Sequence, residues 1–513
     1  MTQEPMAADA QPRGPLKTNI PQRMDRLPWS RWHWLIVAAL GVTWILDGLE
    51  VTIVGALGAV LTHPSTLGLT ESEVGLTASA YLAGSVLGAV VFSYLTDRQG
   101  RKRWFMITLL LYLSATVLTA LSWDLWSFMV FRFLAGAGIG GEYAAINSAI
   151  DELIPARARG HTDLAINGSW WMGTAAGALL TIPLLNPHLI SETLGWRLCF
   201  ALGAILGVAI VLIRRVVPES PRWLLMHGRA AEADRTMAAI DDQARSSGQP
   251  LPAVDDSAAM AIRPAGRTGY LTLLRLIFTG YWRRGVLGAT LMITQSFLYN
   301  AIFFTYTLVL TKFYGVSSSA APIYLIAFAV GNLAGPLTIG RLFDTIGRKT
   351  MISGTYILSG ALLAVTAYLF DQGALTALTQ TIAWCVIFFF ASSGASAAYL
   401  TVSEIFPIEV RAKAIAVFFA IAQCFGAIGP IFYGHLIANG ADTSRLFVGY
   451  LIGAGVMIVG GVVEVVLGIP AERQPLESVA RPLSLVPSTV PRAAGATTAF
   501  SPDRRGTAQG DGR

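Results

Sequence analysis

Long apolar segments alternate with short clusters of charged residues along most of this chain. About twelve of these segments hold roughly twenty residues or more, enough to cross ~30 Å of hydrocarbon as helices that satisfy their own backbone hydrogen bonds. The pattern therefore predicts an all-α membrane protein with twelve transmembrane helices. Their cores are expected at 34–61, 75–95, 104–122, 125–149, 164–186, 195–217, 284–311, 320–340, 350–370, 376–403, 412–436 and 444–468.

The composition agrees with this pattern and argues against several other classes of protein. Of 513 residues, 54% are hydrophobic and only 13% are charged, and the mean hydropathy is +0.56, far from soluble globular usage. Cys199, Cys385 and Cys424 lie in predicted helices without paired spacing, so neither a disulfide framework nor a metal cluster is expected. The scattered histidines and nucleophiles suggest no catalytic constellation. We expect no enzyme activity, no cofactor and no nucleic-acid partner.

Lysine and arginine fall mainly in alternate connections between the predicted helices. Cytoplasmic loops are enriched in these residues, and the other set of connections holds only Arg197, Lys312 and Arg445. Both termini are therefore predicted to be cytoplasmic, and the N-terminal residues lack the apolar core of a secretory signal. The expected organisation is a tail, a six-helix bundle, a cytoplasmic link, a second six-helix bundle and a disordered tail, at 1–33, 34–217, 218–283, 284–470 and 471–513.

Two sequence motifs occur once in each half of the chain. "SYLTDRQGRK" at 93–102 recurs as "GRLFDTIGRK" at 340–349, and "ELIPARAR" at 152–159 recurs as "EIFPIEVR" at 404–411. The chain is therefore predicted to consist of two six-helix repeats in the same orientation. Such parallel repeats place a substrate site at their interface near the middle of the bilayer.

The repeated charged motifs have two interpretations. The bases alone suit a cytoplasmic anchor, and the glycine suits a tight turn. An aspartate at fixed spacing in both halves is not needed for that, and an acid at a helix end can pair with an arginine across an interface that breaks during a conformational change. We favour a gate, with candidate residues Asp97, Arg98, Arg101, Glu152 and Arg159 in the first half and Asp344, Arg348, Glu404 and Arg411 in the second.

These motifs resemble the signatures of the major facilitator superfamily, in which Gly-x-x-x-Asp-Arg-x-Gly-Arg-Arg/Lys joins the second and third helices. Here Ser93 stands in place of the leading glycine, and Thr345 in place of the arginine of the second copy. Within that superfamily the chain is similar to the sugar porters, in "PESPRWLL" at 218–225 and in Arg132, Gly136, Gly138, Gly140, Glu152, Pro155, Arg159 and Gly160. The resemblance covers about residues 34–470 and implies a transporter that works by alternating access.

The positions that contact hexose in sugar porters match less well. Asn167 stands where those proteins place a glutamine in helix five, and Thr294 replaces the first glutamine of a Gln-Gln pair in helix seven. Gln295 and Asn300 are retained, whereas helix ten ends in Tyr399 rather than in Gly-Pro-x-Pro-Trp. The resemblance therefore favours an aromatic or carboxylic acid over a hexose.

Few charged groups fall inside the predicted membrane helices, where each is costly and so a functional candidate. Asp47 and Glu50 share one helical face in "LDGLEVTIVGALG", a segment similar to the Asp-Gly-x-Asp pattern of bacterial proton symporters for aromatic acids. The resemblance implies that Glu50 and Arg132 form a proton-coupling pair, with Asp47 beside them. The alternative is a pair that only holds two helices together. Glu142 is expected to line the cavity or to bind a neighbouring polar group, and Glu464 to lie at the interface with the cytoplasm.

Aromatic and amide side chains on the predicted helices complete the candidate substrate cavity. Flat aromatic walls would suit a planar ligand, although aromatic residues in membrane helices also serve simple packing. The candidates are Asn167, Trp170, Trp171, Gln295, Tyr299, Asn300, Tyr399 and Glu142, with Trp44 and Phe303 as further aromatic residues.

Together these observations predict a secondary active transporter that imports a small organic metabolite with protons. A sugar carrier is the alternative, and a transporter-like sensor is the second alternative. No ATP-binding motif is present in the sequence. We expect a monomer in a lipid bilayer, in the style of a bacterial inner-membrane protein, with protons and a small molecule as its partners.

Overall fold

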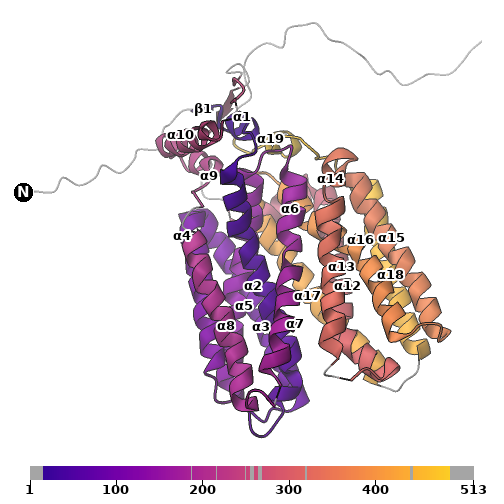
Figure 1. Ribbon diagram of the computed structural model, residues 1–513. Coiled ribbons are helices and arrows are strands. Elements are labelled where there is room, and N and C mark those ends of the chain that lie inside the picture. The colour runs from indigo at the N-terminus through magenta and orange to yellow at the C-terminus, as the bar shows by residue number, and fades with distance from the viewer. Residues whose placement is uncertain are drawn as a thin grey trace, which may run out of the picture.

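The computed structural model describes residues 16–186, 188–214, 217–248, 250–254, 259–263, 269–317, 320–438 and 443–485. Its helices stand side by side in two groups, shown in indigo to magenta and in orange to yellow in Figure 1. The first half comprises α2 (Arg31–Leu61), α3 (Glu71–Gln99), α4 (Arg101–Ala120), α5 (Leu125–Leu153), α6 (Arg159–Gly168), α7 (Trp170–Leu184) and α8 (Glu192–Arg214). The second half comprises α12 (Trp282–Tyr314), α13 (Ala321–Ile339), α14 (Leu342–Thr345), α15 (Arg348–Asp371), α16 (Ala377–Glu404), α17 (Arg411–Ala438) and α18 (Thr443–Leu467).

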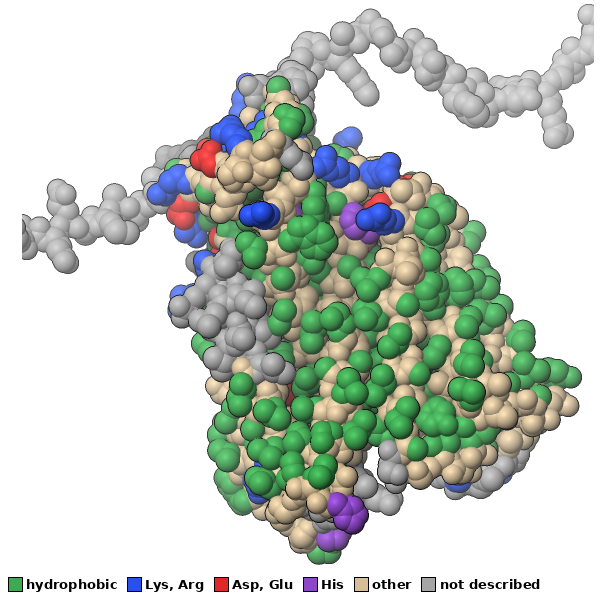
Figure 2. Space-filling model, viewed as in Figure 1, with side chains coloured by type: hydrophobic (Ala, Val, Ile, Leu, Met, Phe, Trp, Pro, Cys, Tyr) green, Lys and Arg blue, Asp and Glu red, His purple; other side chains and the backbone are tan. Residues whose placement is uncertain are grey.

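The predicted twelve-helix membrane fold is confirmed. Within the described residues, nine helices are long and apolar enough to cross a membrane. The other three crossings are α5, the pair α6 and α7, and α8, whose apolar part is Thr193–Ile205. Figure 2 shows apolar side chains over the height of both halves and charged side chains gathered at one end. An apolar surface of this kind suits contact with lipid rather than water.

Local sequence signals explain where several helices begin. The Thr70 hydroxyl caps α3 by accepting a hydrogen bond from the Glu73 backbone nitrogen at 3.3 Å, and the Glu73 carboxylate accepts one from the Thr70 backbone nitrogen at 2.8 Å. Gly100 and Gly347, the glycines of the repeated motif, have φ angles of +105° and +118°, which residues with a Cβ rarely adopt. The motif therefore does form a tight turn before α4 and α15.

Small residues allow α3 and α5 to pack closely. A Cβ at Gly84 or Gly88 on α3, or at Gly136 or Gly140 on α5, would overlap the backbone of the facing helix. Close approach of this kind strengthens van der Waals contact between helices that have no hydrophobic driving force in lipid. This packing fixes the position of α5, which carries Arg132 and Tyr143.

Short elements cover one end of the bundle, called the charged end below (Figure 1). They are β1 (Leu16–Thr18), α1 (Ile20–Asp25), α9 (Pro221–Met226), α10 (Ala230–Ser246), β2 (Met260–Ile262), α11 (Tyr270–Thr279) and α19 (Leu476–Val479). Strand β1 pairs antiparallel with β2 in the link between the halves, and Ile262 also bridges to Leu485. Segments from both ends of the described chain thus meet the link.

One expected boundary needs correction. The sequence predicted a disordered tail from residue 471, but residues 471–485 pack against the charged end and include α19. Leu476 and Val479 are buried there, and Glu477 binds Arg222 of α9 at 3.0 Å. A few apolar side chains and one ion pair order a segment whose composition alone suggested disorder. The rest of that tail, 486–513, lies outside the described residues.

Candidate functional site

A cavity of about 190 Å³ lies between the two halves. It is lined by α2, α3, α5, α6 and α7 from the first half and by α12, α16 and α17 from the second. Most of the residues expected from the sequence line it, namely Asp47, Arg132, Asn167, Trp170, Trp171, Gln295, Tyr299, Asn300 and Tyr399, together with Trp44 and Phe303. The parallel repeat therefore places a cavity where such repeats hold substrate sites.

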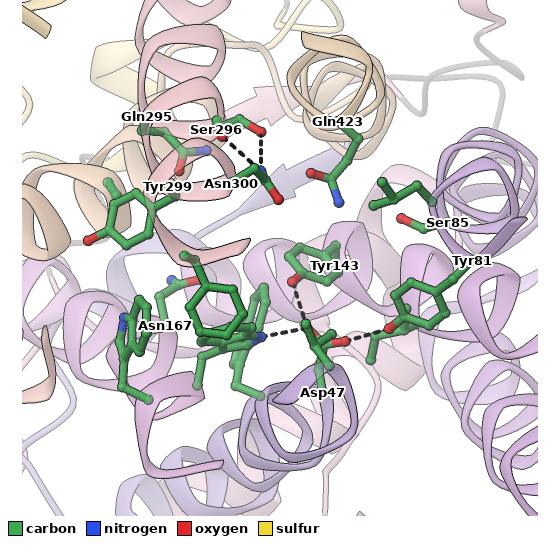
Figure 3. Close-up of a pocket in the computed structure, with 18 of the residues that line it drawn as sticks. Asp47, Tyr81, Ser85, Tyr143, Asn167, Gln295, Ser296, Tyr299, Asn300 and Gln423 are labelled. Carbon is green, nitrogen blue, oxygen red and sulfur yellow. Dashed lines mark hydrogen bonds between the residues drawn. The ribbon is translucent and has the colours of Figure 1, made fainter. Parts of the chain in front are cut away.

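Asp47 accepts hydrogen bonds from three neutral donors on three different helices (Figure 3). The hydroxyl groups of Tyr81 and Tyr143 lie 2.7 Å and 2.9 Å from its carboxylate oxygens, and the Trp170 indole nitrogen lies at 2.7 Å. Asp47 is 3% exposed. An ionised carboxylate only accepts hydrogen bonds, so this arrangement satisfies it without a cation.

Glu50 and Arg132 form a buried ion pair, 2% and 1% exposed. Glu50 also accepts a hydrogen bond from the Thr116 hydroxyl at 3.0 Å, and the Arg132 guanidinium lies 4.3 Å from the centroid of the Tyr81 ring. Arg132 lines the cavity, whereas Glu50 lies behind it against α4 and α8. The structure thus brings together the two residues that the resemblance paired, with the base nearer to the cavity.

Aromatic rings from both halves surround the cavity. The ring centroids of Trp44 and Tyr143 are 4.1 Å apart, and those of Tyr143 and Phe419 are 4.3 Å apart. On the opposite side Trp170 lies 5.6 Å from Phe303. The contacts of Tyr143 with Phe419 and of Trp170 with Phe303 cross between the halves. The lining is apolar and is interrupted by a few polar groups, as is common in small-molecule sites.

Amide and hydroxyl side chains of the second half face the carboxylate (Figure 3). Gln295, Ser296 and Asn300 lie on α12, and Gln423 lies on α17. The Asn300 amide donates to the Ser296 backbone oxygen at 2.8 Å, which leaves its side-chain oxygen toward the cavity. These groups supply both donors and acceptors to a bound molecule.

Sequence reasoning missed several residues that line the cavity. Tyr81, Ser85, Tyr143, Ser296 and Gln423 were not among the candidates, although polar groups on lipid-embedded helices are a signal for them. Glu142 is fully buried but does not line the cavity. Glu464 was expected near the interface with the cytoplasm. It lies in the last turn of α18, where packing inside the second half leaves it 1% exposed.

At the charged end, ion pairs join the two halves. Arg159 of α6 binds Glu404 of α16 at 3.1 Å, and Arg348 of the second half also contacts Glu404. His161 lies 3.0 Å from Asp344, and Arg411 lies 3.9 Å from Asp151. Most of the charged motif residues therefore do meet, although their partners could not be assigned from the sequence.

Other members of the expected set behave differently. Asp97 contacts Lys413 of α17 rather than an arginine. Arg98 is exposed and donates to the Tyr94 hydroxyl at 3.1 Å within its own helix, so it does not join the halves. The Glu152 backbone oxygen accepts a hydrogen bond from Arg222 at 3.0 Å. The Arg101 side chain lies outside the described part of the structure.

The segments next to the two termini add to these contacts. Asp25, at the end of α1, lies 3.7 Å from Arg159 and 3.5 Å from Arg222. Glu477 on α19 holds Arg222 from the other side. Arg222 is the arginine of "PESPRWLL", so that motif connects both ends of the described chain to the interface of the two halves.

Comparison with known proteins gives the family. The model of the sugar (and other) transporter family matches residues 36–481. The chain belongs to this family. It is a multi-pass membrane transporter of the major facilitator superfamily, and its relatives are transporters rather than enzymes.

Two relatives and one solved structure illustrate the range of the family. The niacin transporter NiaP of Acinetobacter baylyi is 27% identical over 457 residues, which cover 89% of this chain and 98% of that protein. The arabinose-proton symporter of Bacillus subtilis is 26% identical over 414 residues, covering 78% and 86%. The proton:xylose symporter XylE, bound to 6-bromo-6-deoxy-D-glucose, matches the fold with a TM-score of 0.71 at 20% identity, covering 88% and 98%.

Proposed function

We propose that this transporter imports a small aromatic or carboxylic acid together with protons. The observation that carries the proposal is the position of Arg132, which contacts Glu50 on one side and lines the cavity on the other. A single guanidinium placed in this way serves either the internal carboxylate or the carboxylate of a substrate.

Protonation of Glu50 would make the exchange possible. A neutral Glu50 holds Arg132 less strongly, so the guanidinium can turn its donors toward a substrate carboxylate in the bidentate manner that arginine favours. The net charge of the buried site is then unchanged, because one proton enters with one anion. Without that proton, an anion would join Asp47 and Glu50 in a poorly solvated space, which is strongly unfavourable.

The aromatic lining supports a flat and partly apolar substrate. Trp44, Tyr143, Trp170 and Phe303 offer ring faces, while the amide groups of Gln295, Asn300 and Gln423 can pair with substituents. A sugar would need a polar partner for nearly every hydroxyl group. The relative named as a niacin transporter is consistent with this class of substrate.

A sugar carrier is the second candidate function. It is favoured by the polar groups on α12 and α17 and by the printed functions of the arabinose and xylose relatives. A sensor that binds a small molecule without transporting it is the third candidate function.

Uptake into proteoliposomes tests these alternatives. Labelled nicotinate and benzoate would be offered with and without an inwardly directed proton gradient, and excess glucose or xylose would be added as competitor. We expect accumulation only with the gradient and little competition by sugar. Strong competition by a sugar would favour the sugar carrier, and binding without accumulation would favour the sensor.

The matched variants are Glu50→Gln and Glu464→Gln. Glu50→Gln resembles the protonated form permanently, so uphill uptake should vanish while counterflow of labelled against unlabelled substrate persists. Glu464→Gln changes a buried acid away from the cavity and should keep both activities. Gradient-driven accumulation by Glu50→Gln would remove Glu50 as the proton carrier.

A further inference from the structure

A buried carboxyl group, Asp163, lies between the cavity and the ion pairs of the charged end. It belongs to α6, one helical turn from Arg159 on one side and from Asn167 on the other. Residues four apart share a helical face. Arg159 binds Glu404 of the second half, and Asn167 lines the cavity. Asp163 therefore occupies the same face, midway between the two functional regions.

Asp163 makes no close ion pair among the described residues, and the nearby Arg348 guanidinium and Asn167 amide favour a negative charge on it less than burial opposes one. It is 1% exposed, and neither carboxyl oxygen receives a hydrogen bond within the described part of the chain. The nearby Asn167 amide donates instead to the Asp163 backbone oxygen at 3.0 Å. An isolated buried carboxylate is so costly that such a group takes up a proton instead.

The charged neighbours do not alter this conclusion. Asp163 interacts electrostatically with Asp151 of α5, with Asp344 of α14 and with Arg348 of α15. Arg348 is already engaged by Asp344 at 3.5 Å and by Glu404 of α16. The two neighbouring acids repel a negative charge on Asp163, and the one nearby base is shared between other carboxylates.

We propose that Asp163 is a second proton-binding site of the transport cycle, which is protonated while the charged end is closed. When the halves separate at that end, water reaches the carboxyl group, and the proton passes from its oxygen to water and leaves a solvated carboxylate. This site extends the proton-coupled cycle proposed above. It lies between the cavity and the charged end and would favour release of protons at the charged end.

The proposal predicts that pH controls whether the charged end is closed. A group that binds a proton only in the closed state stabilises that state at low pH, and the stabilisation is lost as pH rises. The ratio of closed to open molecules should fall by up to about tenfold per pH unit for one such proton.

The separation of the halves can be measured with spin labels at Arg103 and Thr350. These are equivalent exposed positions at the starts of α4 and α15. Cys199, Cys385 and Cys424 would first be replaced.

Glu50→Gln serves as the background, because it removes the other proposed proton carrier. In this background Asp163→Asn should remain closed over the whole pH range, with a flattened pH response. Asp163→Glu should keep the response with a shifted midpoint. Asp151→Asn is the matched control in the opposite direction, since Asp151 faces Arg411 across the halves and its loss should favour opening.

Several outcomes would overturn the proposal. One is an Asp163→Asn protein whose distances respond to pH as the Glu50→Gln background does. If Asp163→Asn does not fold, two other results would overturn the proposal. One is an Asp163→Glu protein whose pH midpoint equals that of the background. The other is a wild-type protein whose spin-label distances do not change with pH. Failure of the proposed function would appear separately, as wild-type uptake that ignores the proton gradient.

Discussion

At the scale of single residues, Asp47 and Glu50 differ in their surroundings. Asp47 faces the cavity and is held by neutral donors, whereas Glu50 lies behind Arg132 and is held by a cation. The two acids are three residues apart on one helix, yet they have different partners because α2 contacts different neighbouring helices at the two positions. Glu50 is therefore the acid that contacts Arg132, as its proposed role as proton carrier requires.

The hydrogen bond from Tyr81 to Asp47 should contribute measurably to stability. Tyr81→Phe removes the hydroxyl but keeps the ring against Arg132, so we expect a loss of about 1.5–3 kcal/mol, typical of hydrogen bonds to charged groups. The measurement is unfolding of the purified protein in detergent. In an Asp47→Asn background the loss should become smaller.

Tyr112→Phe is the matched control for that prediction. Its hydroxyl donates to the Leu46 backbone oxygen at 3.3 Å and interacts with Glu50, but does not bond Asp47, so we expect a loss of about 0.5–3 kcal/mol. The loss of stability caused by Tyr112→Phe should be the same whether residue 47 is Asp or Asn. Equal costs for Tyr81→Phe in both backgrounds would contradict the assigned bond.

At the scale of elements, several helix ends at the charged end are joined to one another by ion pairs. The last turn of α3, with Asp97, reaches α17 through Lys413. The broken helix α6 and α7 carries gate contacts in its first part and cavity residues in its second. Arg222 of the short helix α9 binds Asp25 of α1 and Glu477 of α19, and Asp25 also contacts Arg159. Movement of one of these elements must therefore disturb the others.

Asp97→Asn should open the charged end. It leaves the 1% exposed ammonium of Lys413 without this carboxylate, and breaking a buried pair by removing one partner typically costs about 3–5 kcal/mol. Spin labels at Arg103 and Thr350 should show longer distances, and transport should fall while substrate binding is retained.

Arg98→Gln, in the next position of the same motif, is the control. Arg98 is exposed and bonds only within its own helix among the contacts described above, so distances and transport should stay close to wild type. If Asp97→Asn also leaves both unchanged, the motif acts as a topology signal and turn alone.

The contact between α19 and α9 should weaken in acid. Burial alone would raise the pKa of Glu477, but the guanidinium groups of Arg222, Arg411 and Arg159 outweigh it and hold the pKa below its ordinary value of 4.5. The ionised form is therefore the stabilised one. Its contribution is complete above pH 4.5 and is lost as pH falls through the lowered value.

Comparison of wild type with Glu477→Gln would reveal this contribution. The difference between their unfolding midpoints should be constant near neutral pH and shrink as the pH falls from about 5 to about 3. A difference that does not depend on pH would mean that the ion pair adds nothing to the attachment of α19.

At the scale of the whole molecule, the distribution of charge sets the orientation. The end of the bundle with α1, α9, α10 and α19 carries most of the visible lysine and arginine side chains (Figure 2). Because positive loops stay in the cytoplasm, we propose that this end is cytoplasmic. Its cross-bundle ion pairs would then close the cavity from the cytoplasm in the conformation described.

Cysteine labelling in intact cells tests this orientation. An impermeant maleimide should label His188→Cys, in the connection between α7 and α8, and should not label Arg103→Cys at the start of α4 until the membrane is made permeable. Both positions are exposed in the structure. The reverse pattern would invert the proposed orientation and place the ion pairs on the outer side.

Much of this protein could be predicted from local features of the sequence. The twelve helices followed from the lengths of apolar runs, because the thickness of a bilayer sets those lengths. The turn in each repeated motif followed from its glycine, and the two related halves followed from the repetition itself. Asp47, Glu50, Arg132, Glu142 and Glu464 were also found from the sequence, because a charge inside a predicted membrane helix is conspicuous.

Tertiary structure decided which of these charged residues meet. Asp97 binds Lys413, Asp47 binds Tyr81 and Tyr143, and α19 docks on Arg222. Helical periodicity fixes the face on which a side chain lies but not the helix that packs against that face, which depends on close fit over the whole bundle. Asp163 shows the same limit. The sequence marks it as one acid in a polar stretch at the start of a helix, and only the packing of both halves around α6 buries it with no hydrogen bond to its carboxyl oxygens in the described part of the chain.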